Sequence, residues 1–366
     1  MKKLVLFLFC LALAPFASAQ QEFKIGVVSS LSGGFAAAAK DTMDGWKAWE
    51  KAHGLPGKKI VLEVLDDETN PVSASNAFRR IASDPQVMLV YLFIPSNSVM
   101  AVKSLASEFK VPIVAGGAAD AIGMPADPWV FKVAPAVRDF MTVFAQYAQK
   151  KGYKRIASLN SNDAFGQAEI TNLKALAPKF GVQVVAAETF GVEDTNFNAQ
   201  LTRIRVAKPD IIYDGGSGRA AILTWRAFQQ MGFKQPIVMT QAGIGKAFFE
   251  AIGSPSAADG LMTPMQSGVF GGAAAADTKL YAEMEKALGR APVYFNTFGF
   301  DVGLITEAAV KNSDGSRQGL RDALEKLKDL PAVNGPVTYT PHDHTGQNYR
   351  SIVMGKLKDG KPVPAD

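Results

Sequence analysis

The chain has 366 residues, a formal net charge of +5, and 48% hydrophobic against 20% charged residues. Positive and negative side chains are interspersed without a long basic run, which argues against a nucleic-acid partner. The single cysteine, Cys10, stands in an apolar N-terminal run, so the rest of the chain has no thiol for a disulfide, a nucleophile or a thiolate metal site.

The N-terminus has the pattern of an export signal. Lys2 and Lys3 precede an apolar run over residues 4–16, and Ala-Ser-Ala at 17–19 supplies the small residues that signal peptidase requires. We therefore predict a signal peptide over residues 1–19 and a periplasmic mature chain. Because this run, like every later one, is shorter than the roughly 20 apolar residues that span a bilayer, we expect no direct membrane insertion.

Short β-branched runs alternate with amphipathic stretches after this segment. Strands are predicted over residues 24–28, 59–65, 87–93 and 112–115, and helices over 36–53, 73–83 and 98–109. Such alternation is typical of βαβ units in a parallel sheet.

The same alternation then begins again. Strands are predicted over residues 155–159, 182–187, 210–214 and 236–240, and helices over 167–179, 198–207 and 218–231. The length of the chain also suggests two domains, so the pattern predicts two Rossmann-like α/β lobes. The small-residue stretch 254–272 is interpreted as a segment crossing between them rather than as a core element.

The last part of the chain is predicted to contain three helices and an antiparallel strand pair. The helices cover residues 277–288, 297–311 and 317–327, and the strands cover 335–340 and 351–357, joined through the turn-rich 341–348. His342 and His344 lie in this turn beside Asp343, but a third ligand is not evident, so we expect a structural turn and no metal.

Several motifs, in this order, carry a family resemblance. They are Ile-Gly-Val-Val-Ser-Ser-Leu-Ser-Gly-Gly at 25–34, Asp66-Asp67, Asn-Asp-Ala-Phe-Gly at 162–166, Lys208-Pro209-Asp210 and Gly299-Phe300-Asp301. Together they resemble the branched-chain amino-acid type of periplasmic substrate-binding protein, which feeds ABC importers, and the resemblance covers nearly the whole mature chain. It implies a type I periplasmic binding protein, with two lobes joined by a multi-segment hinge. We place lobe 1 at residues 20–138 plus 268–334, and lobe 2 at 139–267 plus 335–366.

Ligands of parallel α/β sheets bind at the carboxyl ends of the strands, which selects three loops of the first lobe. Glycines after Ser30 and Leu31 let backbone N–H groups approach a ligand. Hydroxyls and amides at a helix N-terminus suit a carboxylate, and the resembled family holds its ligand's carboxylate with the matching second and third loops. Helix capping is the alternative role for the serines. The candidates in the second and third loops are Ser96, Asn97, Ser98, Gly116, Gly117 and Ala118.

The second lobe and one late helix complete the predicted site. Amino-acid binders of the resembled family commonly have an acidic residue near Ala242 to hold the ammonium, and tyrosines near Phe165, Ser217 and Phe300. Since a buried ammonium without a carboxylate is strongly disfavoured, we hypothesise a small hydrophobic carboxylate without an α-amine, such as an aromatic acid. Asp163, Asp214 or Asp120 could instead supply the charge. The candidates are Asp163, Phe165, Gly216, Ser217, Gln241, Ala242 and Phe300; capping for Asp163 and core packing for the phenylalanines are the alternatives.

The chain carries no recognisable catalytic motif. Neither a Gly-x-Ser-x-Gly elbow nor a His-Glu-x-x-His pair nor a phosphate loop occurs, and Gly243-Ile244-Gly245 lacks the third glycine of a dinucleotide site. We expect no enzyme and no cofactor, because a hydrolase built on Asp163 and Ser217 would have no nearby histidine to activate the serine.

The predicted function is therefore capture by lobe closure. We expect a monomer that binds a small-molecule carboxylate and delivers it to an inner-membrane ABC permease. An amino-acid binding protein for ABC uptake and a periplasmic ligand-sensing receptor domain are the alternatives, because the same fold serves all three.

Overall fold

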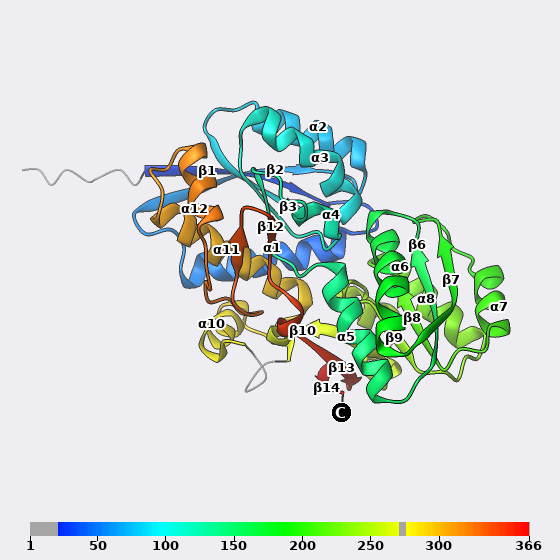
Figure 1. The fold of residues 1–366 in the computed structure, drawn as a ribbon. Helices are drawn as coiled ribbons and strands as arrows, with labels where there is room; N and C mark the ends of the chain where they lie inside the picture. Colours follow the sequence, from blue (N-terminus) through cyan, green and yellow to red (C-terminus); the bar gives the residue numbers. More distant parts are fainter. Residues whose placement is uncertain (1–20, 271–275, 366) are drawn as a thin grey trace, which may run out of the picture.

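The computed structural model describes residues 21–270 and 276–365, which form two α/β lobes (Figure 1). The predicted signal peptide and Cys10 lie outside these residues. Among the described helices, none is long and apolar enough to cross a membrane.

The first lobe is built on a parallel five-stranded sheet in the order β2-β1-β3-β4-β5. Its central strand β3 is buried along almost its whole length, as expected for an apolar strand covered by helices on both faces. The first four strands match the predicted ones, whereas β5 is too short to give a periodic signal. The strands are β1 (Gln21–Ser29), β2 (Lys58–Asp66), β3 (Val87–Phe93), β4 (Ile113–Ala115) and β5 (Val130–Lys132).

Within residues 21–270 and 276–365, seven helices belong to this lobe. Two of them, α1 and α11, pack backbone against backbone: a Cβ added at Gly45 would lie 1.9 Å from the Asn296 carbonyl oxygen, and one at Gly299 would lie 1.8 Å from that of Thr42. Any larger side chain at either glycine would force the helices apart. The helices are α1 (Ala36–Ala52), α2 (Pro71–Ala82), α3 (Ser96–Phe109), α4 (Asp120–Gly123), α10 (Thr278–Leu288), α11 (Tyr294–Lys311) and α12 (Arg317–Glu325).

The second lobe contains a seven-stranded sheet in the order β14-β13-β10-β9-β8-β6-β7. Its strands are β6 (Arg155–Ser161), β7 (Gln183–Phe190), β8 (Ile211–Gly215), β9 (Ile237–Met239), β10 (Met262–Gln266), β13 (Ile352–Lys358) and β14 (Lys361–Pro364). Its helices are α5 (Val137–Lys150), α6 (Ala164–Leu176), α7 (Asn198–Val206), α8 (Arg219–Gln230) and α9 (Lys246–Ala251). The interpretation of 254–272 as a crossing alone was wrong, since β10 is a buried strand of this sheet.

The C-terminal strand pairing differs from the prediction. Strand β11 (Thr338–Thr340) pairs with β12 (Asp343–Gly346), while β13 pairs with β10 and β14. The β11–β12 hairpin packs on the first lobe because His344 is buried there, with its ring stacked on Phe131 at 4.3 Å. We therefore propose that the last passage between the lobes follows residue 347, rather than residue 335.

Three segments connect the lobes: the links from β5 to α5, from β10 towards α10, and from β12 to β13. A buried polar chain joins two of them. The Gln266 side-chain amide donates to the Gln347 side-chain oxygen, and the Gln347 amide donates to Asp301 at 3.2 Å. Burial raises the pKa of Asp301 to about 7. Two of the three links are thus joined by hydrogen bonds and are not independent linkers.

Candidate functional site

A cleft of about 630 Å³ lies between the lobes, where the loops after the strands of both sheets meet. The lobes contact each other beside it: the Gly34 carbonyl oxygen accepts the backbone N–H of Arg219 at 3.2 Å. Gly218 has φ 54°, and a Cβ there would come within 2.6 Å of the Gly34 oxygen. This close approach of the two backbones therefore requires glycine.

Aromatic side chains from both lobes line the cleft. Phe35 and Phe295 of the first lobe pack edge to face with ring centroids 5.5 Å apart, and the second lobe contributes Phe190 and Phe248. These four were missed in the sequence. Their positions could have indicated this role, because Phe35 follows the Gly33-Gly34 loop and Phe295 stands in the first turn of α11. That helix was predicted to begin only at residue 297.

The N-terminus of α3 opens into the cleft. Pro95 precedes this helix and no side chain caps it, while Asn97 of its first turn lines the cleft. The Asn97 side-chain oxygen is buried and has no hydrogen-bond partner. Helices α1 and α8 also begin at the cleft without a side-chain cap. Uncapped N–H groups and the helix dipoles favour a negatively charged ligand group.

The other polar candidates of the first lobe bond within the protein. The Ser30 hydroxyl donates to Asp67 at 2.6 Å, and the Ser96 hydroxyl oxygen accepts the N–H groups of Ala118 and Ala119 at 3.1 and 3.2 Å. These contacts hold neighbouring loops together and cap no helix, so the helix-capping alternative does not describe either serine. Neither serine lines the cleft. Five further candidates also lie outside its lining: Leu31, Ser98, Gly116, Gly117 and Ala118.

Three candidates of the second lobe do line the cleft: Asp163, Ser217 and Ala242. Asp163 also caps α6, because its carboxylate accepts the Gly166 N–H at 3.0 Å and the Ser161 hydroxyl at 2.7 Å. Its predicted capping role is therefore confirmed. Whether these three residues contact a ligand stays a prediction.

The remaining candidates are buried behind the cleft or away from it. Phe165 and Gln241 are 6% and 1% exposed, and Gly216 donates its N–H to Asp214. Phe300 is fully buried on α11, with its ring 5.8 Å from that of His53. The core-packing alternative describes both phenylalanines, because each side chain lies among buried apolar residues and outside the cleft lining.

Two other acidic residues could have paired with a ligand ammonium in place of an acid at position 242, but both have partners elsewhere. Asp214 is fully buried, accepts the Thr224 hydroxyl at 2.8 Å, and has its pKa raised by burial to about 7. Asp120 bonds Arg138 and Asn172 outside the cleft. Glu169, behind the cleft, has its pKa raised by burial to about 8 although Tyr213 donates to it at 2.6 Å.

No cluster of histidine and acidic residues suited to a metal occurs among the residues that the structure describes. His344, which the sequence pairs with His342, points into the first lobe instead, with Nδ1 2.9 Å from the Val130 carbonyl oxygen. Its role in the described structure is packing of the hairpin.

Two hinged α/β lobes with a ligand-sized cleft between them define the substrate-binding class of protein. A family model for periplasmic binding proteins matches residues 22–361, and the chain belongs to this family. This match and the similar proteins named next confirm the type I fold and the resemblance to the branched-chain amino-acid type.

Three proteins illustrate what this chain is similar to. The Leu/Ile/Val-binding protein BraC3 of Rhizobium johnstonii is 25% identical over 97% of this chain and 96% of its own. An extracellular ligand-binding receptor from Rhodopseudomonas palustris is 27% identical, with a TM-score of 0.84 over 94% of this chain and 100% of its own. An ABC-transporter solute-binding protein from R. palustris, solved with benzoate, has a TM-score of 0.81 at 22% identity, over 94% and 95% of the two chains.

Proposed function

We propose that this protein captures a small hydrophobic carboxylate without an α-amine, with an aromatic acid as the favoured case, and delivers it to an inner-membrane ABC importer. The observation that carries the proposal is the cleft itself, where the uncapped start of α3 faces a space lined by four phenylalanines. The helix start suits the carboxylate and the rings suit an apolar body.

The acidic side chains of the cleft argue against an ammonium group. Asp163 caps α6, and Asp41 is 5% exposed and 3.6 Å from Arg290. Glu68 is exposed and accepts the Ser73 hydroxyl at 3.3 Å, and Glu193 is 87% exposed and lies 3.8 Å from Arg219. Ala242 occupies the wall where the resembled family commonly has an acid. An ammonium buried at that wall would lack the charge partner that offsets its desolvation.

Binding without chemistry is the expected activity, because the named relatives are binding proteins and lobe closure needs no reaction. The benzoate-bound neighbour supports the idea that this fold accommodates an aromatic acid. We further propose that the protein acts in the periplasm as a monomer and that the closed form is the one the permease recognises.

An amino-acid ligand is the second candidate. The Leu/Ile/Val-binding relative favours it, and so does the presence of Asp163 on the cleft wall. One Asp163 carboxylate oxygen accepts both of the hydrogen bonds described above, so the other oxygen would have to hold the ammonium.

A thermal-shift panel on protein that has been unfolded and refolded to remove bound ligand separates the two candidates. Benzoate, phenylpropenoid and branched aliphatic acids are compared with leucine, isoleucine, valine and phenylalanine. A ligand that binds only the native state raises the melting temperature. Stabilisation by the acids alone supports the proposal, whereas stabilisation by the amino acids moves the assignment to amino-acid uptake.

The substitution Asn97→Asp tests the carboxylate position. A negative charge in the first turn of α3 should repel the ligand's carboxylate and abolish the stabilisation. Asn198→Asp makes the same change in the first turn of α7, outside the cleft, and should leave the response intact. Equal responses in both variants would contradict the proposed orientation.

A further inference from the structure

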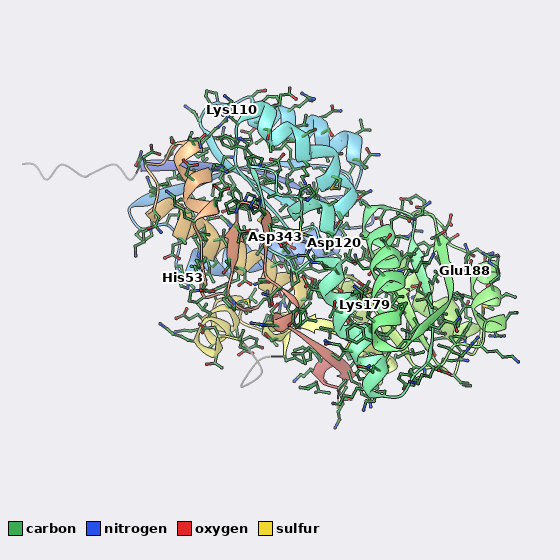
Figure 2. The ribbon with its side chains drawn as sticks, in the orientation of Figure 1. His53, Lys110, Asp120, Lys179, Glu188 and Asp343 are labelled. Atoms are coloured by element: carbon green, nitrogen blue, oxygen red, sulfur yellow. The ribbon has the colours of Figure 1, made fainter. Side chains whose placement is uncertain are left out.

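A polar contact joins the two lobes outside the cleft. The Asn172 side-chain amide on α6 of the second lobe donates to the Asp120 carboxylate at the start of α4 in the first lobe, at 2.5 Å. The other Asp120 oxygen accepts the backbone N–H of Arg138 at 3.1 Å, at the start of α5. One carboxylate therefore bonds one first-lobe segment to two helices of the second lobe. Figure 2 shows Asp120 at the border between the lobes.

The two bonds differ in their distance along the chain from the hinge. Arg138 directly follows the first link between the lobes, so its position changes little when the lobes rotate about that link. Asn172 lies in the third turn of α6, away from the links. A hinge rotation that opens the cleft moves α6 from α4, and the Asn172 bond is the one that must break.

The first-lobe side of the contact is held rigidly. The Lys132 ammonium, fully buried in β5, donates to the Ala118 carbonyl oxygen at 2.9 Å, and the Ser96 hydroxyl oxygen accepts the Ala118 and Ala119 N–H groups. Asp120 directly follows this segment. A carboxylate on a fixed support can discriminate between two positions of α6, whereas one on a mobile loop would follow the helix.

Apolar packing accompanies the bond. Ala168, one turn before Asn172, packs against core residues of the first lobe as well as of the second. Ala168 also accepts the second N–H of the Asn172 amide through its carbonyl oxygen at 2.9 Å, which orients that amide towards Asp120. The face of α6 that meets the first lobe thus presents a small apolar residue and an oriented donor.

We propose that Asp120 and Asn172 form a latch that favours the closed arrangement of the lobes in the ligand-free protein. Neither Asp120 nor Asn172 lines the cleft. The latch therefore sets ligand affinity through the closed population, because the apparent dissociation constant falls as the fraction of binding-competent protein rises. The inference rests on lobe closure in the proposed function but is independent of which ligand binds.

The test measures the distance between the lobes without ligand. Val72 on α2 and Val206 on α7 are 70% and 75% exposed, and replacing both by cysteine allows a spin-label pair on the mature protein. The label pair is placed in four proteins: one with Asp120 and Asn172 unchanged, one with Asn172→Asp, one with Asp120→Asn, and one with both substitutions. Lys174→Ala, an exposed position on the same helix, is the control.

Two carboxylates at the latch should repel, so Asn172→Asp is expected to lower the closed-to-open ratio about tenfold. The double variant restores an amide–carboxylate pair with exchanged roles and should return the ratio to within about twofold of the starting value. A merely structural defect would not be rescued in this way.

Three outcomes would overturn the latch: an Asn172→Asp distance distribution equal to that of Lys174→Ala, a double variant that stays open, or a parent protein without any closed population. Because the measurement uses no ligand, a negative thermal-shift panel leaves it interpretable, and the two proposals fail separately.

Discussion

The two lobes use their strand-end loops differently. In the first lobe two of the three predicted hydroxyl groups, those of Ser30 and Ser96, hold the lobe's own loops by hydrogen bonds, and Asn97 is the predicted residue that lines the cleft. In the second lobe Asp163, Ser217 and Ala242 all form part of the cleft wall. A polar residue at a strand end is therefore as often a support for the site as a part of it.

The largest expected effect tests this division at Ser96. Ser96→Ala removes the acceptor of two buried N–H groups, so we expect a loss of about 2–3 kcal/mol in the free energy of unfolding. Urea unfolding monitored by circular dichroism measures it. A variant as stable as the parent would mean that the loop finds other acceptors and that the serine is not its support.

A charge on the second-lobe wall should change ligand preference. Ala242→Asp is expected to weaken binding of a stabilising acid about tenfold, and to strengthen binding of the corresponding amino acid, because the new carboxylate repels one and pairs with the other. Calorimetric titration measures both. Ala257→Asp, at an exposed position outside the cleft lining, should alter neither.

The buried acid behind this wall should make stability depend on pH. The pKa of Asp214 is about 7 in the folded protein, against 3.8 as its ordinary value. The native state therefore binds more protons between about pH 4 and 7, and this group's contribution to stability falls as pH rises through that window.

Asp214→Asn removes that titration while keeping an acceptor for Gly216. Relative to the parent, the variant should gain about 2–3 kcal/mol of stability between pH 5 and pH 8. Urea unfolding at a series of pH values gives the difference. A constant offset across the range would show that Asp214 does not titrate there.

The smallest effect is expected at Ser217. Ser217→Ala should change the free energy of unfolding by less than about 0.5 kcal/mol and weaken ligand binding only a few-fold, since the half-buried side chain lies on the cleft wall. Parallel unfolding and titration experiments compare it with Ser96→Ala. Similar stability losses in the two variants would abolish the distinction between the lobes.

Most of the fold could be predicted because its signals are local. Apolar periodicity predicts strands such as β3 and helices such as α1. The short strand β5 and the β11–β12 hairpin carry weaker signals, and the pairing of β13 with β10 joins segments almost a hundred residues apart. Pairing between strands so far apart in the sequence depends on which sheet edges the rest of the fold leaves unpaired, and a local sequence pattern does not contain that information.

The candidate site could be located but not assembled from the sequence. Strand ends selected the right edge of both sheets, yet Phe300 and Phe165 proved to be core, while Phe35 and Phe295 line the cleft. Residues on one helix face either the core or the cleft according to the helix's rotation, as Phe295 and Phe300 of α11 do. That rotation follows from the close packing of α11 on α1.

Periodicity and residue identity are properties of short segments, and they were enough to indicate the two-lobed α/β class, the position of the site at the strand ends and the alanine at position 242. Packing of the folded chain sets which polar groups face the cleft, where the hairpin docks and that Asp120 meets Asn172. Those are contacts between distant segments, and they exist only once both lobes have folded and approached each other.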